Sequence, residues 1–495
     1  MGLKSFFSKL LAHFAVSKLK REAKNGVELQ QKTFKALVKK AANTEFGRQH
    51  NFKSIENYAD FVKNIPVREY EQFESYIEKI KAGQQNILWP GKPLYLCKTS
   101  GTTSGAKFIP LTKASLPNHI NSARNALFCY IAETGNAKFT EGKMIFLQGS
   151  PVMEKTKGDI AYGRLSGIVA NHVPTYLQKN RMPSFKTNCI EDWDQKVNAI
   201  VDETLKEDMT LISGIPNWVM MYFEKLIKKS GKKNIGELFP NFNLFVYGGV
   251  NVEPYRNKFN EIIGKKIPTI ELYPASEGFI AFQDSQKEEG LLLNVNSGIF
   301  FEFIPAEEYF NQNPLRLTLG EVKKNINYAL VLSSNAGLWA YSIGDTVKFV
   351  SLEPPRIKVT GRIKHFTSAF GEHVIAEEVE AALKFACKKI HLSVTEFHVA
   401  PEVNPQSGLP YHEWFIETDS VPTDIEEMRT LIDNKMQQLN VYYNDLIKGN
   451  ILQPCKLTFL QKGAFNRYMK SVGKLGGQNK VPRLANDREI ADKLI

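Results

Sequence analysis

The stretch that decides the fold lies between residues 209 and 278, where short apolar runs alternate with amphipathic segments. Its successive parts are MTLISG (209–214), PNWVMMYFEKLIKK (216–229), FNLFVYGG (242–249), PYRNKFNEIIG (254–264) and TIELYPASEG (269–278). The short apolar runs predict strands, and the longer segments between them predict helices. Because strands that alternate with helices form parallel sheets covered by helices, this stretch predicts an α/β fold.

Outward from this stretch the pattern changes in both directions. Residues 26–85 favour helices, and PLYLCK (93–98) and KMIFLQG (143–149) predict further strands. The final block, from about residue 364 to 495, mixes strands and helices and predicts a small α+β domain. After residue 290, short strands follow one another and predict an antiparallel or barrel-like subdomain; they are GIFFEFIP (298–305), NYALVLSS (327–334), LWAYSIGDTVKFV (338–350) and RIKVTGR (356–362).

The composition sets the broad class. The chain has 495 residues, of which 43% are hydrophobic, so two or three globular domains are expected. The net charge of +12 suits a surface that attracts nucleic acid, anionic lipid or anionic metabolites. The basic residues are dispersed, however, so a solvated lysine-rich exterior is the plainer interpretation, and no nucleic-acid partner is expected. The five cysteines form no CxxC pair, which favours a reducing, cytoplasmic location over a disulfide framework or zinc site.

The first residues, MGLKSFFSKLLAHFAVSKLKREAKNG (1–26), form one amphipathic segment. Ser8, Lys9 and His13 interrupt it too often for a membrane span, so no stable membrane insertion is expected. Its larger apolar residues fall on one helix face; they are Phe6, Leu10, Leu11 and Phe14. We expect this face to dock on the protein body, with contact to a membrane surface as the alternative.

The segment TSGTTSGAK (99–107) is the first candidate binding loop. Hydroxyl residues and glycines form helices and cores poorly, so an exposed loop is expected. Its hydroxyls, from Ser100, Thr102 and Thr103, can donate to phosphate oxygens together with backbone N–H groups, and Lys107 adds a positive charge. The spacing is not that of a Walker A loop. Composition alone leaves a phosphate loop and an ordinary turn equally open.

Two further segments place polar residues near strand ends. ELYPASEGFIAF (271–282) puts Tyr273, Ser276 and Glu277 where a strand ends, and ligands of open parallel sheets bind at such ends. The tyrosine can stack on a base and the glutamate can hold Mg²⁺; a buried tyrosine and a helix-capping Ser–Glu pair are the alternative.

The second of these segments is WAYSIGDTVKF (339–349), in which Asp345 is expected in a turn between two strands. Its carboxylate either accepts hydrogen bonds from a ribose or simply forms part of a hairpin turn.

Taken together, the order and spacing of these motifs resemble the adenylate-forming enzymes. The resemblance comprises the Thr/Ser/Gly loop ending in Lys107, the Tyr273–Glu277 loop, the Tyr341–Asp345 motif and a Gly-Arg pair at 361–362 that leads into a helix. More closely, the chain resembles the GH3 family of acyl-acid amido synthetases, and this likeness covers nearly the whole chain. Three stretches carry it: YGRLSGIVA (162–170), SGIPNWVMMYFEKL (213–226) and GQNKVPR (477–483).

The resemblance implies an adenylate-forming fold, with a large N-terminal domain (1–360) and a small, mobile C-terminal domain (361–495). It implies that ATP and Mg²⁺ are used to activate a carboxylic acid as an acyl adenylate, whose acyl group passes to an amine, an amino acid in this family. An acyl- or aryl-CoA ligase and a non-catalytic nucleotide-binding protein are the alternatives. The partners are then small molecules only, and the chain is expected to be a monomer.

The resemblance also assigns roles to individual residues. Lys107, Glu277 and Lys480 are the implied catalytic residues, of which Glu277 holds Mg²⁺ and Lys480 stabilises charge on the α-phosphate. The implied nucleotide-binding residues are Ser100, Thr102 and Thr103 at the phosphates, Gly249 and Tyr273 at the adenine, Asp345 and Arg362 at the ribose, and Ser276 beside them. The chain departs from the family pattern at Ser342, where an arginine is usual, and at Pro274, where a glycine is common.

Overall fold

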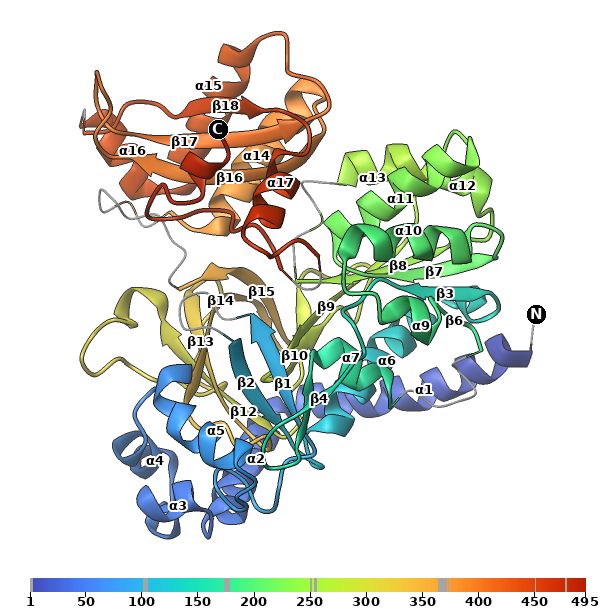
Figure 1. The fold of residues 1–495 in the computed structure, drawn as a ribbon. Helices are drawn as coiled ribbons and strands as arrows, with labels where there is room; N and C mark the ends of the chain where they lie inside the picture. Colours follow the sequence, from blue (N-terminus) through green and yellow to red (C-terminus); the bar gives the residue numbers. More distant parts are fainter. Residues whose placement is uncertain are drawn as a thin grey trace. The chain divides into compact units, whose positions relative to one another are not determined.

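The computed structural model describes residues 3–100, 106–172, 179–249, 252, 256–363, 372, 374–449, 451–476 and 479–495 (Figure 1). The chain divides into two compact units. The first comprises residues 1–215, 238–249 and 267–358, and the second comprises residues 216–237, 250–266 and 359–495. The predicted α/β class, with a β-rich part and a C-terminal α+β part, is confirmed.

Helices of the first unit lie mainly in its N-terminal third, as the sequence predicts for residues 26–85. They are α1 (Leu3–Lys24), α2 (Gly26–Ala41), α3 (Glu45–Gln49), α4 (Tyr58–Asn64), α5 (Glu74–Lys81), α6 (Leu116–Thr134), α7 (Leu165–Ala170), α9 (Phe185–Asn188) and α10 (Trp193–Thr204), with the 3₁₀ helices η1 (Phe52–Ser54), η2 (Tyr70–Phe73), η3 (Lys138–Thr140) and η5 (Ala306–Glu308).

An eleven-stranded sheet forms the centre of the first unit, in the order β12-β13-β14-β15-β11-β10-β9-β8-β7-β3-β6. The strands from β6 to β9 pair in parallel, whereas β9 pairs with β10, β10 with β11 and β12 with β13 antiparallel. Both predicted patterns are therefore found in one sheet. The strands are β3 (Lys143–Phe146), β6 (Arg181–Met182), β7 (Met209–Ser213), β8 (Leu244–Gly248), β9 (Thr269–Ala275), β10 (Gly278–Phe282), β11 (Leu291–Leu293), β12 (Ile299–Pro305), β13 (Asn327–Ser334), β14 (Tyr341–Leu352) and β15 (Pro355–Arg362).

The antiparallel half of this sheet is strongly curved. Four strands separate β10 from β12, so a flat sheet would hold them about 24 Å apart. Nevertheless, a Cβ atom added to Gly278 of β10 would overlap the Ile299 side chain of β12. Only a sheet that curls back on itself brings these residues together, which confirms the barrel-like prediction.

A buried glutamine of α2 covers the edge strand of the sheet. Gln30 Nε2 donates to the carbonyl oxygens of Val295 and Ile299, both at 2.8 Å, and Gln30 Oε1 accepts from the Phe301 N–H at 2.8 Å. Two of these groups, the Ile299 carbonyl and the Phe301 N–H, belong to β12. Gln30 thereby satisfies part of the edge of the sheet, and Leu317 pairs with Phe303 further along it.

A buried ion pair joins the N-terminal helices to the sheet. The side chains of Glu302 on β12 and Arg316 are 0% and 3% exposed, and Arg316 Nε and Nη2 donate to Glu302 Oε1 at 2.9 and 2.5 Å. The Tyr58 hydroxyl donates to the same carboxylate at 2.9 Å, and Arg316 Nη1 donates to the Ile65 carbonyl. Both charges thus have partners from α4 and the residue that follows it.

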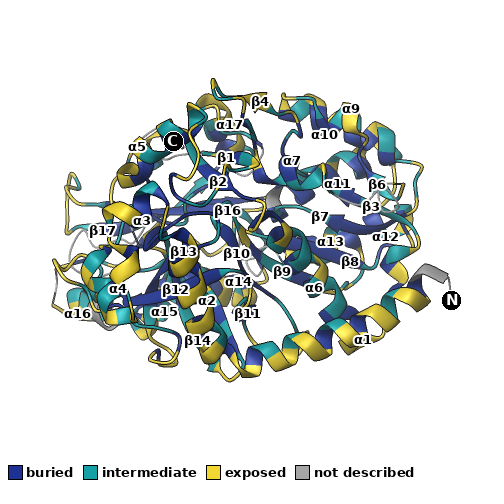
Figure 2. Cartoon of the chain, turned by 90° about the horizontal axis from the view of Figure 1, so that it is seen from below, coloured by how far each residue is buried: buried dark blue, intermediate teal, exposed yellow. Residues whose placement is uncertain are grey.

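Helix α1 docks through the face opposite to the predicted one. It packs on α6 with Ala12, Val16 and Ala23, which are buried. The larger apolar residues Phe6, Leu10, Leu11 and Phe14, predicted to dock, are between 49% and 66% exposed. Figure 2 shows that much of α1 is coloured as exposed. The prediction of a docked helix was right and its face was wrong, because small side chains let two helices approach closely. No helix within the described ranges is both long and apolar enough to cross a bilayer.

The second unit has its own sheet and core. Strands β16 (Val394–Glu402), β17 (Tyr411–Thr418) and β18 (Lys456–Leu460) form a three-stranded sheet. Helices α14 and α15 contribute Leu383 and Ile432 to the core beneath it. Its helices are α11 (Pro216–Ser230), α12 (Ile235–Leu238), α13 (Arg256–Ile263), α14 (Ala376–Ile390), α15 (Ile425–Leu439), α16 (Val441–Lys448) and α17 (Ala464–Ser471), with the 3₁₀ helix η6 (Ala491–Lys493).

We expect Arg316→Met to destabilise the first unit by about 3–5 kcal/mol, because the Glu302 carboxylate stays buried after its cation has gone. Urea unfolding, followed by tryptophan fluorescence, measures the loss. The double variant Glu302→Leu/Arg316→Met removes both charges and should regain most of the lost stability. A single variant as stable as the parent would show that the pair does not hold the N-terminal helices to the sheet.

Candidate active site

The two ends of the first candidate binding segment, 99–107, belong to strands and not to a loop. Strands β1 (Tyr95–Ser100) and β2 (Ala106–Leu111) pair antiparallel in a small sheet with β5 (Ala161–Gly163) and β4 (Glu154–Lys155). Thr99 pairs with Lys107, so both ends of the predicted loop are strand. The prediction was wrong there because a β-branched residue such as Thr99 suits a strand, where its backbone pairs with that of Lys107. Thr102 and Thr103 lie outside the described residues, as does the side chain of Ser100.

Lys107 is held against helix η2 rather than on an exposed loop. Its side chain is 24% exposed, and Nζ lies 3.7 Å from the Glu71 carboxylate and 5.4 Å from the centre of the Tyr70 ring. The Tyr70 hydroxyl accepts a hydrogen bond from the Phe108 N–H at 2.9 Å, which ties η2 to β2. The ammonium group is therefore positioned by its neighbours before any ligand binds.

Ser276 and Glu277 form the tight turn between β9 and β10, where Ala275 pairs with Gly278. The predicted strand end is correct, and the helix-capping alternative is wrong because a strand follows. Tyr341 is buried, and burial, followed by the charge of Glu277, raises the pKa of its hydroxyl well above the ordinary value. Burial, and next the charge of Glu277, also raise the pKa of Cys97 on β1.

Asp345 lies inside strand β14 and not in the predicted turn between two strands. On β14, Ile343, Gly344 and Asp345 stand opposite the single residue Leu330 of β13, which is a β-bulge. Gly344 has a φ of +80°, which glycine adopts readily and other residues rarely do. The misplacement has a physical cause, because a bulge and a hairpin turn both require glycine at such a position.

The bulge directs Asp345 toward β9. Its Oδ2 accepts a hydrogen bond of 2.6 Å from the hydroxyl of Tyr273, which is buried. Gly249 follows β8 with a φ of +82°, and Gly248 pairs with Leu272 of β9. Gly249 therefore lies at the same sheet edge as the Ser276–Glu277 turn, because the carboxyl ends of parallel strands coincide.

Two predicted site residues, Arg362 and Lys480, belong to the second unit. Arg362 ends β15 and is exposed. Lys480 is exposed and is followed closely by Arg483, which ion-pairs with Glu380 at 3.3 Å and with Glu396. The Val399 N–H donates to the Arg483 carbonyl at 2.9 Å. Lys480 thus lies on a segment whose backbone is hydrogen-bonded to β16 at Arg483.

Sequence reasoning missed three residues of this neighbourhood. Tyr341 belongs to the quoted Tyr-x-x-Gly-Asp motif, but no role was derived for it. Glu71 and Tyr70 lie in a helical stretch without any motif, and only the folded chain brings them to Lys107. At the atypical position, Ser342 accepts a hydrogen bond of 2.8 Å from the Tyr309 hydroxyl.

Few of the described side chains are grouped as ligands for a metal ion. Among the described residues, no three His, Cys, Asp or Glu side chains are clustered for metal binding. Mg²⁺ commonly takes one or two carboxylates and completes its shell with phosphate oxygens and water, so Glu277 alone suits an ion that arrives with a nucleotide.

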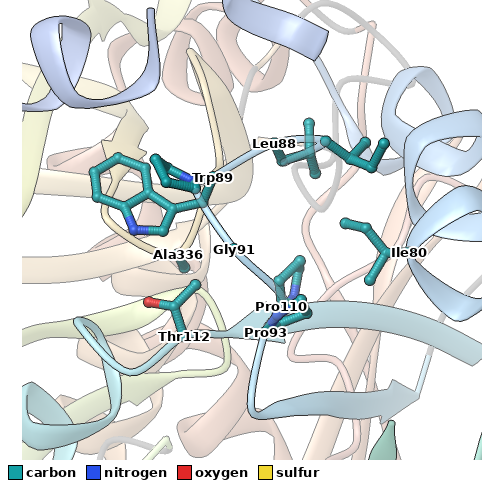
Figure 3. Close-up of a pocket in the computed structure, with 10 residues that line it drawn as sticks. Ile80, Leu88, Trp89, Gly91, Pro93, Pro110, Thr112 and Ala336 are labelled. Carbon is teal, nitrogen blue, oxygen red and sulfur yellow. The ribbon is translucent and has the colours of Figure 1, made fainter. Parts of the chain in front are cut away.

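The cavity in Figure 3 is too small to be the ligand site. It is lined by Ile80, Leu88, Trp89 and Pro110, measures about 10 Å³ and holds at most one water.

Models of one family match most of the chain. The GH3 family N-terminal domain matches residues 15–191 and 165–268, the central domain matches residues 292–362 and the C-terminal domain matches residues 377–489. Indole-3-acetic acid-amido synthetase GH3.15 of Arabidopsis thaliana is 32% identical, over 94% of this chain and 91% of its own. Jasmonoyl-L-amino acid synthetase JAR4 of Nicotiana attenuata is 22% identical, over 94% of this chain and 92% of its own.

Solved structures show the same fold. The GH3.15 acyl acid amido synthetase superposes with a TM-score of 0.79 at 17% identity, covering 97% of this chain and 95% of its own. A 2-hydroxyisobutyryl-CoA ligase in the postadenylation state superposes with a TM-score of 0.55 at 13% identity, covering 97% and 90%. At 17% and 13% identity, these two likenesses concern the fold alone.

We expect Asp345→Ala to raise the KM for ATP by roughly 10–100-fold if this carboxylate accepts hydrogen bonds from the ribose, since such bonds to a charged group contribute about 1.5–3 kcal/mol each. Steady-state kinetics at varied ATP measures the change. Tyr273→Phe is the matched control, because it removes the 2.6 Å hydrogen bond and leaves the carboxylate. If both variants lose affinity equally, Asp345 acts only by holding Tyr273.

Proposed function

The chain belongs to the GH3 family, and we propose that it is an ATP-dependent acyl-acid amido synthetase. It activates a carboxylic acid as an acyl adenylate and transfers the acyl group to an amine, an amino acid. The observation that carries this proposal is the 2.6 Å hydrogen bond between Tyr273 and Asp345, which joins two of the motifs expected to bind the nucleotide. The family matches and the amido synthetase relatives support it.

In the first step, an oxygen of the acid attacks the α-phosphorus of ATP and pyrophosphate leaves. Adenylate-forming enzymes use ATP in this way because a free carboxylate is a poor electrophile. The site must then position the reactants and neutralise negative charge. Lys107 on β2 would contact the phosphates, a role that Ser100, Thr102 and Thr103 would share, and Asp345 and Arg362 would hold the ribose. Tyr273, Gly249 and Ser276 border the nucleotide.

Glu277 is the residue that would hold Mg²⁺. It lies in the turn between β9 and β10, at the sheet edge where the parallel strands β8 and β9 end, which is where ligands of such sheets bind. When bound, the ion would neutralise charge on the phosphates and stabilise the leaving pyrophosphate.

In the second step, the amine attacks the acyl carbon and AMP leaves. We propose that residues 1–360 and 361–495 act as two domains that rearrange between the steps about Gly361 and Arg362. The gap between the central-domain match, which ends at 362, and the C-terminal match, which begins at 377, supports this boundary. The enzyme would act as a cytoplasmic monomer on small-molecule substrates.

A second candidate is an acyl- or aryl-CoA ligase, which shares the first step and the fold of the 2-hydroxyisobutyryl-CoA ligase. Purified protein supplied with ATP, a panel of acids, and either CoA or amino acids distinguishes the two. Acid-dependent pyrophosphate release with an acyl-amino acid product is the expected result. A thioester product would favour the ligase, and pyrophosphate release that ignores the acid would contradict both enzymes.

We expect Lys107→Ala to slow ATP–pyrophosphate exchange by about 10²-fold, since it removes a positive charge aimed at the phosphates. The folded state should change little, because its pair with half-exposed Glu71 contributes about 1 kcal/mol or less. Lys113→Ala, which alters an exposed lysine beyond the end of β2, is the control. Unchanged exchange in folded Lys107→Ala would remove this lysine from the phosphate site.

Lys480→Ala tests the two-domain proposal. If the small domain closes over the site during adenylation, the variant loses charge stabilisation at the α-phosphate, and that half-reaction slows about 10²-fold. Amide formation from separately supplied acyl adenylate should be affected less. The control is Lys470→Ala, an exposed lysine on α17 of the same unit. If only amide formation slows, the role assigned to Lys480 is wrong; if neither half-reaction slows, Lys480 is a surface lysine.

A further inference from the structure

Helix α1 has two apolar faces, of which the protein body covers only one. The inner face packs on α6 through the small side chains of Ala12, Val16 and Ala23. The outer face exposes Phe6, Phe7, Leu10, Leu11 and Phe14, whose side chains are 58%, 52%, 49%, 56% and 66% exposed. The usual distribution is reversed, because the largest apolar residues of the helix face outward.

These residues form one patch rather than scattered exposed positions. At 100° per residue, Phe6, Leu10 and Phe14 follow one another along the helix, with Phe7 and Leu11 beside them. Figure 2 shows the exposed residues running along α1. Contiguous exposed apolar surface of this kind marks a surface that binds a partner or a membrane.

The charge of α1 indicates the partner. The C-terminal half of the helix carries Lys18, Lys20, Arg21 and Lys24, all exposed. Its one carboxylate, Glu22, is engaged by Lys18 at 3.7 Å and by the Asn296 amide at 2.8 Å. The outer side of the helix is therefore apolar over its first turns and basic over its last ones. A partner must accept both, which an anionic lipid surface does.

We propose that α1 is a peripheral membrane-binding helix. It lies in the plane of an anionic bilayer surface, with Phe6, Leu10 and Phe14 inserted among the upper acyl chains and Lys20, Arg21 and Lys24 at the headgroups. The inner face stays packed on α6, so binding requires no unfolding. A second copy of the chain fits this surface less well: a parallel pair of helices brings the two basic ends together, and an antiparallel pair lays each basic end against the partner's apolar first turns. The proposal concerns location and does not depend on the proposed activity.

Vesicle sedimentation with the full-length protein tests the proposal. Vesicles of phosphatidylcholine alone are compared with vesicles that also contain phosphatidylglycerol, at low and high salt. We expect the protein to bind the anionic vesicles at least about 10-fold better, with the preference weakened by salt. Absence of binding to anionic vesicles at low salt, or equal binding to both compositions, overturns the proposal.

Matched variants separate the apolar and basic contributions. Phe6→Ser/Leu10→Ser/Phe14→Ser should reduce binding by about 10-fold or more, and Lys20→Gln/Arg21→Gln/Lys24→Gln should remove the preference for anionic lipid. The control Phe185→Ser/Leu315→Ser alters equally exposed apolar residues elsewhere and should bind like the parent.

Two further readouts complete the test. Circular dichroism should show that the apolar variant keeps its helix content, and pyrophosphate exchange should be unchanged, so that loss of vesicle binding is distinguished from failure of the enzyme. If light scattering shows that the parent is a dimer and the apolar variant a monomer, a second copy covers the patch and the membrane proposal is wrong.

Discussion

The candidate site depends on one hydrogen bond, from the hydroxyl of Tyr273 on β9 to Asp345 on β14. Three strands lie between these two in the sheet order, so a flat sheet would separate them by about 19 Å. A tyrosine and an aspartate side chain cannot span that distance, yet their oxygen atoms lie 2.6 Å apart. The site therefore exists only because the antiparallel half of the sheet curls, and the close approach of Gly278 to Ile299 shows the same curvature independently.

The change from parallel to antiparallel pairing at β9 explains where the polar residues gather. Parallel strands β8 and β9 end at the same edge, and the reversal into β10 forces a tight turn there, which carries Glu277. The antiparallel half contributes Asp345 from β14. The bulge at Gly344 interrupts the alternation of side chains between the two faces of the sheet. A regular strand would fix which face of the sheet Asp345 points to, so the bulge allows the chain to place this carboxylate independently of the strand's buried face.

Local patterns in the sequence predict the strands, the helices and the motif residues Tyr273, Glu277 and Asp345, because periodicity and turn chemistry are short-range properties. They do not predict what non-local packing decides. The glycine before Asp345 was compatible with a turn or a bulge, and only the register with β13 distinguishes them. The apolar face of α1 that is exposed was predicted to be buried. The sequence alone does not show which face of α1 packs on α6. No motif in the sequence predicts the contact between Glu71 and Lys107.

That last pair bears on how the site accepts a nucleotide. Burial raises the pKa of Tyr341 most, and the charges of Glu277 and then Glu71 raise it further, so two carboxylates act on one residue. Lys107 offsets part of this negative potential, but its 3.7 Å contact with Glu71 is long and partly solvated, so exchanging the carboxylate for a phosphate costs little. If ATP binds as proposed, a phosphate that replaces Glu71 at Lys107 would add negative charge beside the two carboxylates. A divalent cation bound with the nucleotide would offset that charge, so the acidic surroundings of Tyr341 favour the metal-bound form of the nucleotide under the proposed function.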